Sequence, residues 1–127
     1  MVSNKIYFTP ASAKKTLPLV KKIVSDILKE GEIIKSYQSE ILSADSNDMA
    51  IQNSLHKIQN YTDELAEIGC YFKDWNFEVG LVDFPAIIND KEVLLCWKSD
   101  EETLLYYHPI EGGFASRKLI PEEYYLL

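Results

Sequence analysis

Four polar residues in the second half of the chain could do chemistry around a pair of glycines. The four are Asp83, Glu101, His108 and Arg117, and the glycines are Gly112 and Gly113. A carboxylate and a histidine can exchange protons, and an arginine can hold a carboxylate or a phosphate with two hydrogen bonds. If these side chains meet in one pocket, they predict a small enzyme or a binder of small molecules or anions.

Asp83 is unusual because it interrupts the apolar run Leu81–Pro85. A carboxylate placed there is partly desolvated, so it must pair with a cation or keep its proton. Lys98 and Arg117 are the partners that we expect. The pattern fits a structural ion pair as well as a functional carboxylate.

His108 ends an apolar run beside Pro109. A lone histidine at such a position is more often structural than a base or a ligand. In the strand register that we expect, Asp83 and His108 lie on opposite faces of the sheet and about 10 Å apart along the strand. This register disfavours an Asp–His dyad, and a register slip would restore it.

Other kinds of chemistry find little support in the sequence. The two histidines, His56 and His108, form no HxxxH motif, and the two cysteines form no CxxC motif, so no metal site is predicted. Cys96 lies in an apolar run and fits a small core residue better than a nucleophile. We therefore assign no catalytic residue, no metal ligand and no cofactor.

The elements that must position these residues begin with the segment 80–108, which predicts three antiparallel strands. A two-residue turn at Asn89–Asp90 joins the first two strands, and a turn at 99–102 joins the second two. The cross-strand pairs that follow are Asp83 with Cys96, Phe84 with Leu95, Trp97 with Leu104, and Val93 with His108. A further short strand is expected at 70–73.

Alternation along these strands separates two faces. The face that we expect to form the core collects Val82, Phe84, Ala86, Ile88, Val93, Leu95, Trp97, Leu104 and Tyr106, with His108 at its end. The other face is too apolar to stay bare. The N-terminal arm, the C-terminal tail or a second subunit must cover it.

The segment 9–69 predicts a long antiparallel helical hairpin. Thr9 and Pro10 suit the start of its first helix, and Pro18 predicts a kink or an interruption. Gly31 lies on the apolar stripe and suggests a close crossing. The whole chain is thus expected to be one α+β domain, 1–127, with the helical hairpin packed on a small antiparallel meander, 70–120, and a short helical turn at 121–127.

Charge is distributed unevenly along the 127 residues, whose net charge is −7. Residues 1–35 carry seven lysines against three acids, a net of +4, and the remaining residues carry six basic against seventeen acidic side chains, a net of −11. An acidic body disfavours nucleic acid, which could be contacted only through Lys14, Lys15, Lys21 and Lys22. With no membrane-length apolar run, no secretory signal and cysteines that we expect to be reduced, we place the protein in the cytoplasm.

Several motifs together resemble a known family. They are FTPASAKKTLPLV at Phe8–Val20, GLVDFP at Gly80–Pro85, LCWK at Leu95–Lys98, the pair Tyr107-His108, and GGFASRKLI at Gly112–Ile120. In this order and spacing they resemble the prokaryotic domain of unknown function 2203 family. The resemblance implies one recurring set of residues: Asp83, Cys96, Trp97, Glu101, His108, Gly113, Phe114 and Arg117. It brings no activity, substrate or cofactor with it.

We therefore favour a non-enzymatic binding or protein-interaction module that self-associates as a homodimer. The apolar second face of the sheet supports this, and so do the opposite charges of the two regions, which would attract each other within one molecule or between two copies. Its binding residues would be Asp83, Trp97, Glu101, His108, Gly113 and Arg117. The alternatives are the small enzyme or small-molecule binder described above, and contact with nucleic acid through the lysines of the first helix.

Overall fold

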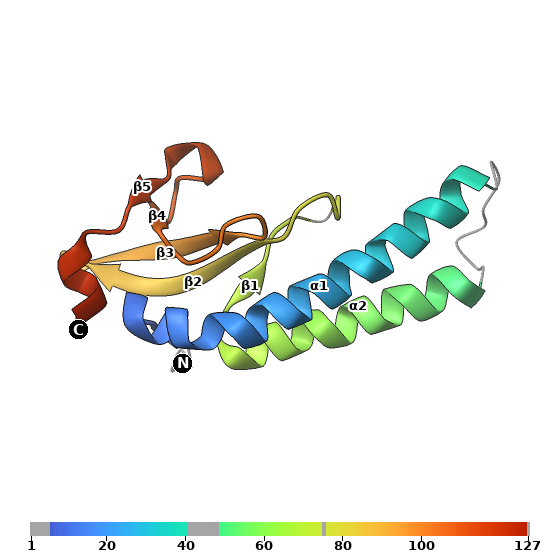
Figure 1. Ribbon diagram of the computed structural model, residues 1–127, viewed down its shortest axis with the longest axis horizontal. Coiled ribbons are helices and arrows are strands. Elements are labelled where there is room, and N and C mark those ends of the chain that lie inside the picture. The colour runs from blue at the N-terminus through green and yellow to red at the C-terminus, as the bar shows by residue number, and fades with distance from the viewer. Residues whose placement is uncertain (1–5, 41–48, 75, 127) are drawn as a thin grey trace.

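The computed structural model describes residues 6–40, 49–74 and 76–126, and the side chains of 38–40 lie outside that description. Two helices are followed by a five-stranded antiparallel sheet (Figure 1). The elements are α1 Pro10–Glu40, α2 Met49–Ile68, β1 Tyr71–Phe72, β2 Leu81–Ile88, β3 Lys91–Lys98, β4 Tyr106–Pro109, η1 Phe114–Ser116, β5 Lys118–Leu119 and η2 Glu122–Leu126. The strand order is β1-β2-β3-β4-β5, which confirms the α+β class and the meander.

Helix α1 begins where the sequence predicts. The Thr9 hydroxyl accepts a hydrogen bond from the Ser12 amide at 3.0 Å, and the Ser12 hydroxyl accepts one from the Thr9 amide at 2.9 Å. This reciprocal pair satisfies amides that the first turn of a helix leaves without partners. Pro18 lies inside α1, which continues through it as one helix to Glu40.

Gly31 allows the close approach that its place on the apolar stripe suggested. The ring of Phe77, in the loop between β1 and β2, packs directly on it, so a β-carbon at Gly31 would lie only 2.5 Å from Phe77 Cβ. Helix α2 runs alongside α1 and ends at Gly69, whose φ of 111° few residues other than glycine adopt. The amide of Cys70 then donates back to the Leu65 carbonyl and closes the helix end.

The hairpin of β2 and β3 has the predicted register. Asp83 lies opposite Cys96, and Phe84 lies opposite Leu95. The turn residues Asn89 and Asp90 have φ values of 53° and 63°, as the two central residues of a type I′ turn require. Because the turn holds two residues, every side chain of both strands takes the face that the sequence predicts.

The register of β3 with β4 differs from the prediction by one residue. Val93 lies opposite Pro109 and Leu94 opposite His108, whereas we expected Val93 opposite His108. The cause is the connection 99–105, which is longer than the turn that we expected. The slip moves His108 and Tyr106 from the core face to the opposite face of the sheet.

The core lies between the helices and one face of the sheet. Phe84, Leu95, Trp97 and Leu104 are fully buried there against Val20, Val24 and Ile27 of α1 and Leu65 of α2. Figure 1 shows the connection from β4 to β5, with η1, on the side of the sheet away from the helices. Phe8 of the N-terminal arm pairs with the free edge of β2 beside Ala86. Within the described residues, no helix has both the length and the hydropathy to cross a membrane.

Candidate functional site

Three strands bring a carboxylate, a thiol and an imidazole together on the face opposite the core. Asp83 of β2 and Cys96 of β3 are direct cross-strand partners. His108 of β4 lies opposite Leu94 and therefore diagonal to Cys96. Asp83 and His108 are separated by the whole width of β3, roughly 9.5 Å from strand to strand. They can meet because Cys96, the residue between them, has a short side chain.

We call Asp83, Cys96 and His108 the Asp–Cys–His cluster. One ligand atom of each residue lies within 4.8 Å of the other two. Asp83 Oδ1 lies 3.5 Å from His108 Nε2. All three residues are buried, with exposed fractions of 3% for Asp83, 2% for Cys96 and 4% for His108. The predicted absence of an Asp–His dyad is therefore wrong, and the slipped register of β4 is the reason.

The orientation of the His108 ring is fixed by its other nitrogen. His108 Nδ1 lies 2.8 Å from the carbonyl oxygen of Pro109. A carbonyl only accepts hydrogen bonds, so Nδ1 donates and carries a hydrogen. In the neutral ring, Nε2 then turns a lone pair toward the Asp83 carboxylate. Two electron-rich atoms at that distance need a proton or a cation between them. In metal-binding histidines, the ring nitrogen that does not bind the metal commonly donates a hydrogen bond of the kind that Nδ1 makes here.

The cation that contacts Asp83 is Lys73, not Lys98 or Arg117 as we expected. Lys73 Nζ lies 3.4 Å from Asp83 Oδ2. Lys73 follows β1, the edge strand that pairs with β2 at Asp83. The two expected partners have carboxylates of their own: Lys98 pairs with Asp100 at 3.2 Å, and Arg117 pairs with Glu101.

Arg117 and Glu101 form a second polar group next to the cluster. Arg117 Nη2 donates to both carboxylate oxygens of Glu101, at 2.6 and 2.7 Å, and to the carbonyl of Cys96 at 3.2 Å. Its guanidinium lies 4.0 Å from the centre of the Tyr106 ring and 4.6 Å from that of Phe114. The carboxylate contact predicted for Arg117 is present, and its partner lies within this chain.

Glu101 also explains the length of the connection between β3 and β4. Its carboxylate accepts from the Lys98 amide at 2.8 Å, and its backbone amide donates to the Lys98 carbonyl. Its own carbonyl accepts from Trp97 Nε1 at 2.9 Å. Trp97 is consequently a core residue with its indole N–H satisfied. Gly113 is an exposed residue directly before η1.

Cys96 is the residue that connects the two polar groups. Burial, followed by the nearby charge of Asp83, raises the pKa of the Cys96 thiol to about 12, and the charge of Arg117 opposes this shift. The thiol therefore keeps its proton at neutral pH and is a poor nucleophile. It becomes a thiolate only if a stronger positive charge than Arg117 comes close.

Reasoning from the residues treated Cys96 as a core residue, although the family resemblance placed it in one set with Asp83 and His108, and neither included Lys73. Cys96 could have been found, since the predicted register of β2 and β3 already placed it opposite Asp83. Lys73 had no such signal, because the two-residue strand β1 gives too little pattern to fix its register.

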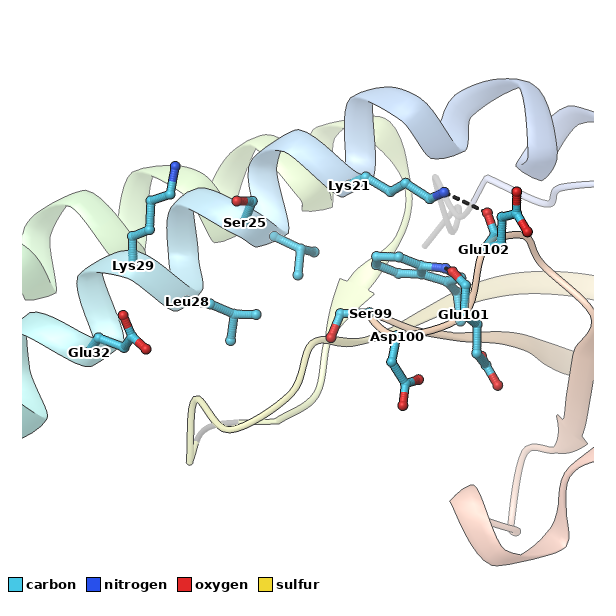
Figure 2. Close-up of a pocket in the computed structure, with 11 residues that line it drawn as sticks. Lys21, Ser25, Leu28, Lys29, Glu32, Ser99, Asp100, Glu101 and Glu102 are labelled. Carbon is cyan, nitrogen blue, oxygen red and sulfur yellow. Dashed lines mark hydrogen bonds between the residues drawn. The ribbon is translucent and has the colours of Figure 1, made fainter.

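A separate groove of about 550 Å³ lies between α1 and the connection 99–105 (Figure 2). Most polar groups that the connection contributes to this groove already have hydrogen-bond or ion-pair partners. Lys21 Nζ donates to the Glu102 carbonyl, as the dashed line in Figure 2 marks, and the Ser99 hydroxyl accepts from the Gly80 amide. Trp97 and Glu101 line this groove, but the residues of the Asp–Cys–His cluster do not.

Three of the four lysines that we considered for nucleic acid have contacts within the chain. Lys21 is held as described, Lys22 pairs with Asp26 at 2.9 Å, and Lys14 lies 4.9 Å from the centre of the Tyr125 ring. The Lys22 side chain is nevertheless 71% exposed, and phosphate contact through these lysines stays a prediction.

Comparison with known proteins gives a family and no characterised relative. No curated protein and no solved structure matches the chain. A family model described as "Uncharacterized conserved protein (DUF2203)" matches residues 6–120, and so covers both helices, all five strands and every residue of the two polar groups. The chain therefore belongs to the DUF2203 family of uncharacterised conserved proteins.

Proposed function

We propose that this protein binds a divalent transition-metal ion through Asp83, Cys96 and His108. The observation that supports the proposal is the convergence of a carboxylate oxygen, a thiol sulfur and an imidazole nitrogen within 4.8 Å at a buried position. Buried groups of this kind are costly to leave without compensation. A bound cation would satisfy all three at once.

The mixture of donors indicates the class of ion. Sulfur and nitrogen ligands suit zinc and its neighbours among the transition metals, whereas magnesium and calcium prefer oxygen alone. In a tetrahedral zinc site with bonds of about 2.0–2.1 Å, ligand atoms stand roughly 3.3 Å apart. The 3.5 Å between Asp83 Oδ1 and His108 Nε2 is close to that spacing. Water or an exogenous ligand would take the fourth position.

Binding has to overcome the proton on Cys96. With the pKa of this thiol raised to about 12, removing the proton at pH 7 costs roughly 7 kcal/mol. Metal binding requires the thiolate, so the ion and the proton compete for Cys96. The affinity for the ion should therefore increase with pH.

Cobalt(II) titration of the chelator-treated protein tests the proposal. We expect one ion per chain, with the intense visible bands of a tetrahedral site and a near-ultraviolet sulfur-to-cobalt band. Cys96→Ala should abolish the sulfur band, and His108→Ala should weaken binding at least tenfold, as losing a ligand does. Cys70→Ala is the matched control, because Cys70 is the other buried thiol and lies outside the cluster.

Two results would contradict the metal site. One is the absence of saturable binding by a folded protein. The other is a sulfur band that survives in Cys96→Ala and disappears in Cys70→Ala. Circular dichroism of each variant ensures that a lost band reflects a lost ligand rather than an unfolded chain.

We also propose that the protein self-associates as a homodimer in the cytoplasm. Exposed apolar side chains on the two helices support this, among them Leu19, Ile33, Met49 and Leu55. So does the opposite charge of residues 1–35 and the rest of the chain. The two free, buried thiols fit a reducing compartment. Light scattering after size exclusion should give twice the chain mass of 14.6 kDa, and a monomer at high micromolar concentration would refute the dimer.

A further inference from the structure

We infer that Lys73 is a tethered competitor of the metal ion for the Asp83 carboxylate. This inference rests on the proposed metal site. The two oxygens of Asp83 face two different groups: Oδ1 lies 3.5 Å from His108 Nε2, and Oδ2 lies 3.4 Å from Lys73 Nζ. A metal ion held by Asp83 and His108 would share its carboxylate with the ammonium group of Lys73.

Lys73 is the member of this group that reaches solvent. Its side chain is 53% exposed, whereas that of Asp83 is 4% exposed and that of His108 5%. Its backbone is anchored by a hydrogen bond from the Lys73 amide to the Leu81 carbonyl at 2.8 Å. The ammonium can therefore leave the carboxylate and return to it while the backbone stays in place.

The competition follows from charge. Without a metal ion, the ammonium group compensates a carboxylate that is otherwise buried. With the ion bound, the ammonium and the ion are like charges on one carboxylate, and each disfavours the other. Lys73 therefore stabilises the metal-free protein and weakens metal binding by the same interaction.

The Lys73–Asp83 contact also influences which ions can bind. An ion that binds through oxygen alone gains little beyond what the ammonium already offers Asp83. An ion that also binds the sulfur of Cys96 and the nitrogen of His108 gains two ligands for which Lys73 cannot compete. Lys73 thus favours thiophilic ions over magnesium or calcium.

The test compares zinc affinities of the full chain, measured by competition with a chromophoric chelator, for three proteins: wild type, Lys73→Met and Lys22→Met. Methionine keeps most of the length and apolar character of the lysine stem and removes its charge. Lys22→Met is the matched control, because it removes an exposed lysine from the Lys22–Asp26 pair on α1. We expect Lys73→Met to bind zinc about two- to fivefold more tightly, the range of a half-exposed ion pair, and Lys22→Met to match the wild type.

A second measurement follows the lysine itself. Metal binding should free the Lys73 ammonium, so an amine-reactive label followed by peptide mass spectrometry should modify Lys73 faster in the zinc-loaded protein. Labelling of Lys22 should not change with zinc.

The outcomes separate this inference from the metal site. If the wild type binds zinc and Lys73→Met binds it equally or less tightly, the competitor role is wrong and the metal site stands. If neither protein binds zinc, both are wrong. If only Lys73→Met binds measurably, the competitor role is supported in its strongest form.

Discussion

The two faces of the sheet are built by alternate residues of the same strands, yet they serve different purposes. Phe84 and Leu95 are opposite each other on the face that packs on the helices, and Asp83 and Cys96 are opposite each other on the other face. Both pairs are buried. On the helix side, burial is compensated by close packing of apolar groups. On the far side, it is compensated by charges and hydrogen bonds from Lys73, Arg117, Glu101 and the Pro109 carbonyl.

This comparison teaches that burial alone does not identify the core of this protein. An apolar side chain is stabilised by many neighbours of suitable shape, so the loss of one neighbour changes the stability only gradually. A buried charge depends on one or two partners placed at a defined distance, so its energetics change sharply when one partner is removed. The two faces should therefore respond differently to substitution and to pH.

The largest effect is expected on the helix side. Phe84 is fully buried and meets the Phe8 ring edge-on at 5.2 Å between ring centres. Phe84→Ala should lower the free energy of unfolding by about 3–5 kcal/mol in a urea titration, because it leaves a cavity. Ile87→Ala, at a position of the far face where the side chain is 53% exposed, is the control and should change it by less than about 1 kcal/mol. Equal effects of the two would mean that close packing around Phe84 does not stabilise the helix side.

The pH dependence of stability is a second large effect. Burial raises the pKa of both Cys70 and Cys96 from 9.0 to about 12. Below pH 9 both thiols are protonated whether the chain is folded or unfolded, and between pH 9 and 12 only the unfolded chain loses these protons. Stability should therefore fall as pH rises through this window, by up to roughly 4 kcal/mol per thiol at pH 12.

The double variant Cys70→Ala, Cys96→Ala isolates the contribution of the thiols from that of lysines and tyrosines, which titrate in the same range. Unfolding by urea at pH 7, 9, 10 and 11 should show the wild type losing stability more steeply than the double variant. Parallel curves would show that the folded state does not hold these protons.

A moderate effect is expected at the second polar group. Glu101→Ala removes both carboxylate acceptors of the Arg117 guanidinium, leaving the Cys96 carbonyl, and also removes the acceptor of the Lys98 amide. We expect a loss of about 2 kcal/mol in the free energy of unfolding, since a largely buried guanidinium loses its counterion. Asp100→Ala, which removes an exposed carboxylate one residue away, should change stability by less than about 0.5 kcal/mol. A cycle with Arg117→Ala should find the two losses far from additive.

The smallest effect concerns the turn that keeps the two faces in register. Asp90 has a φ of 63°, a conformation in which glycine is less strained. Asp90→Gly should raise the free energy of unfolding by about 0.5–1 kcal/mol, seen as a melting temperature a few degrees higher. Since the register stays the same, zinc affinity should not change. A change in zinc affinity would show that the turn influences the Asp–Cys–His cluster directly.

Much of the fold follows from local signals in the sequence. Thr9 and Pro10 begin α1, Gly69 ends α2, and Asn89–Asp90 sets the register of β2 and β3. Each of these residues acts on neighbours within a few positions, so its effect can be worked out without knowing the rest of the molecule. Thr9 and Gly69 satisfy helix ends, and a two-residue turn leaves one choice of cross-strand pairs.

The site could not be derived in the same way, because it depends on contacts between distant segments. The connection 99–105 owes its length to Glu101, whose carboxylate folds back on Lys98 and reaches Arg117 across the sheet. That fold-back shifts β4 by one residue and brings His108 beside Cys96. The sequence contains Glu101 and Arg117, but no local rule says that they pair with each other rather than with Asp83 or Lys98.

The strict chain order of the strands has a consequence for how the protein acquires its site. Each strand pairs with its sequence neighbour, so the sheet can form by successive closure of local hairpins, a route that favours rapid folding. Asp83 and Cys96 come together as soon as the first of these hairpins closes, and His108 arrives only with the second. Any ion that requires all three ligands would therefore stabilise the product of the later step, and so slow unfolding rather than speed folding.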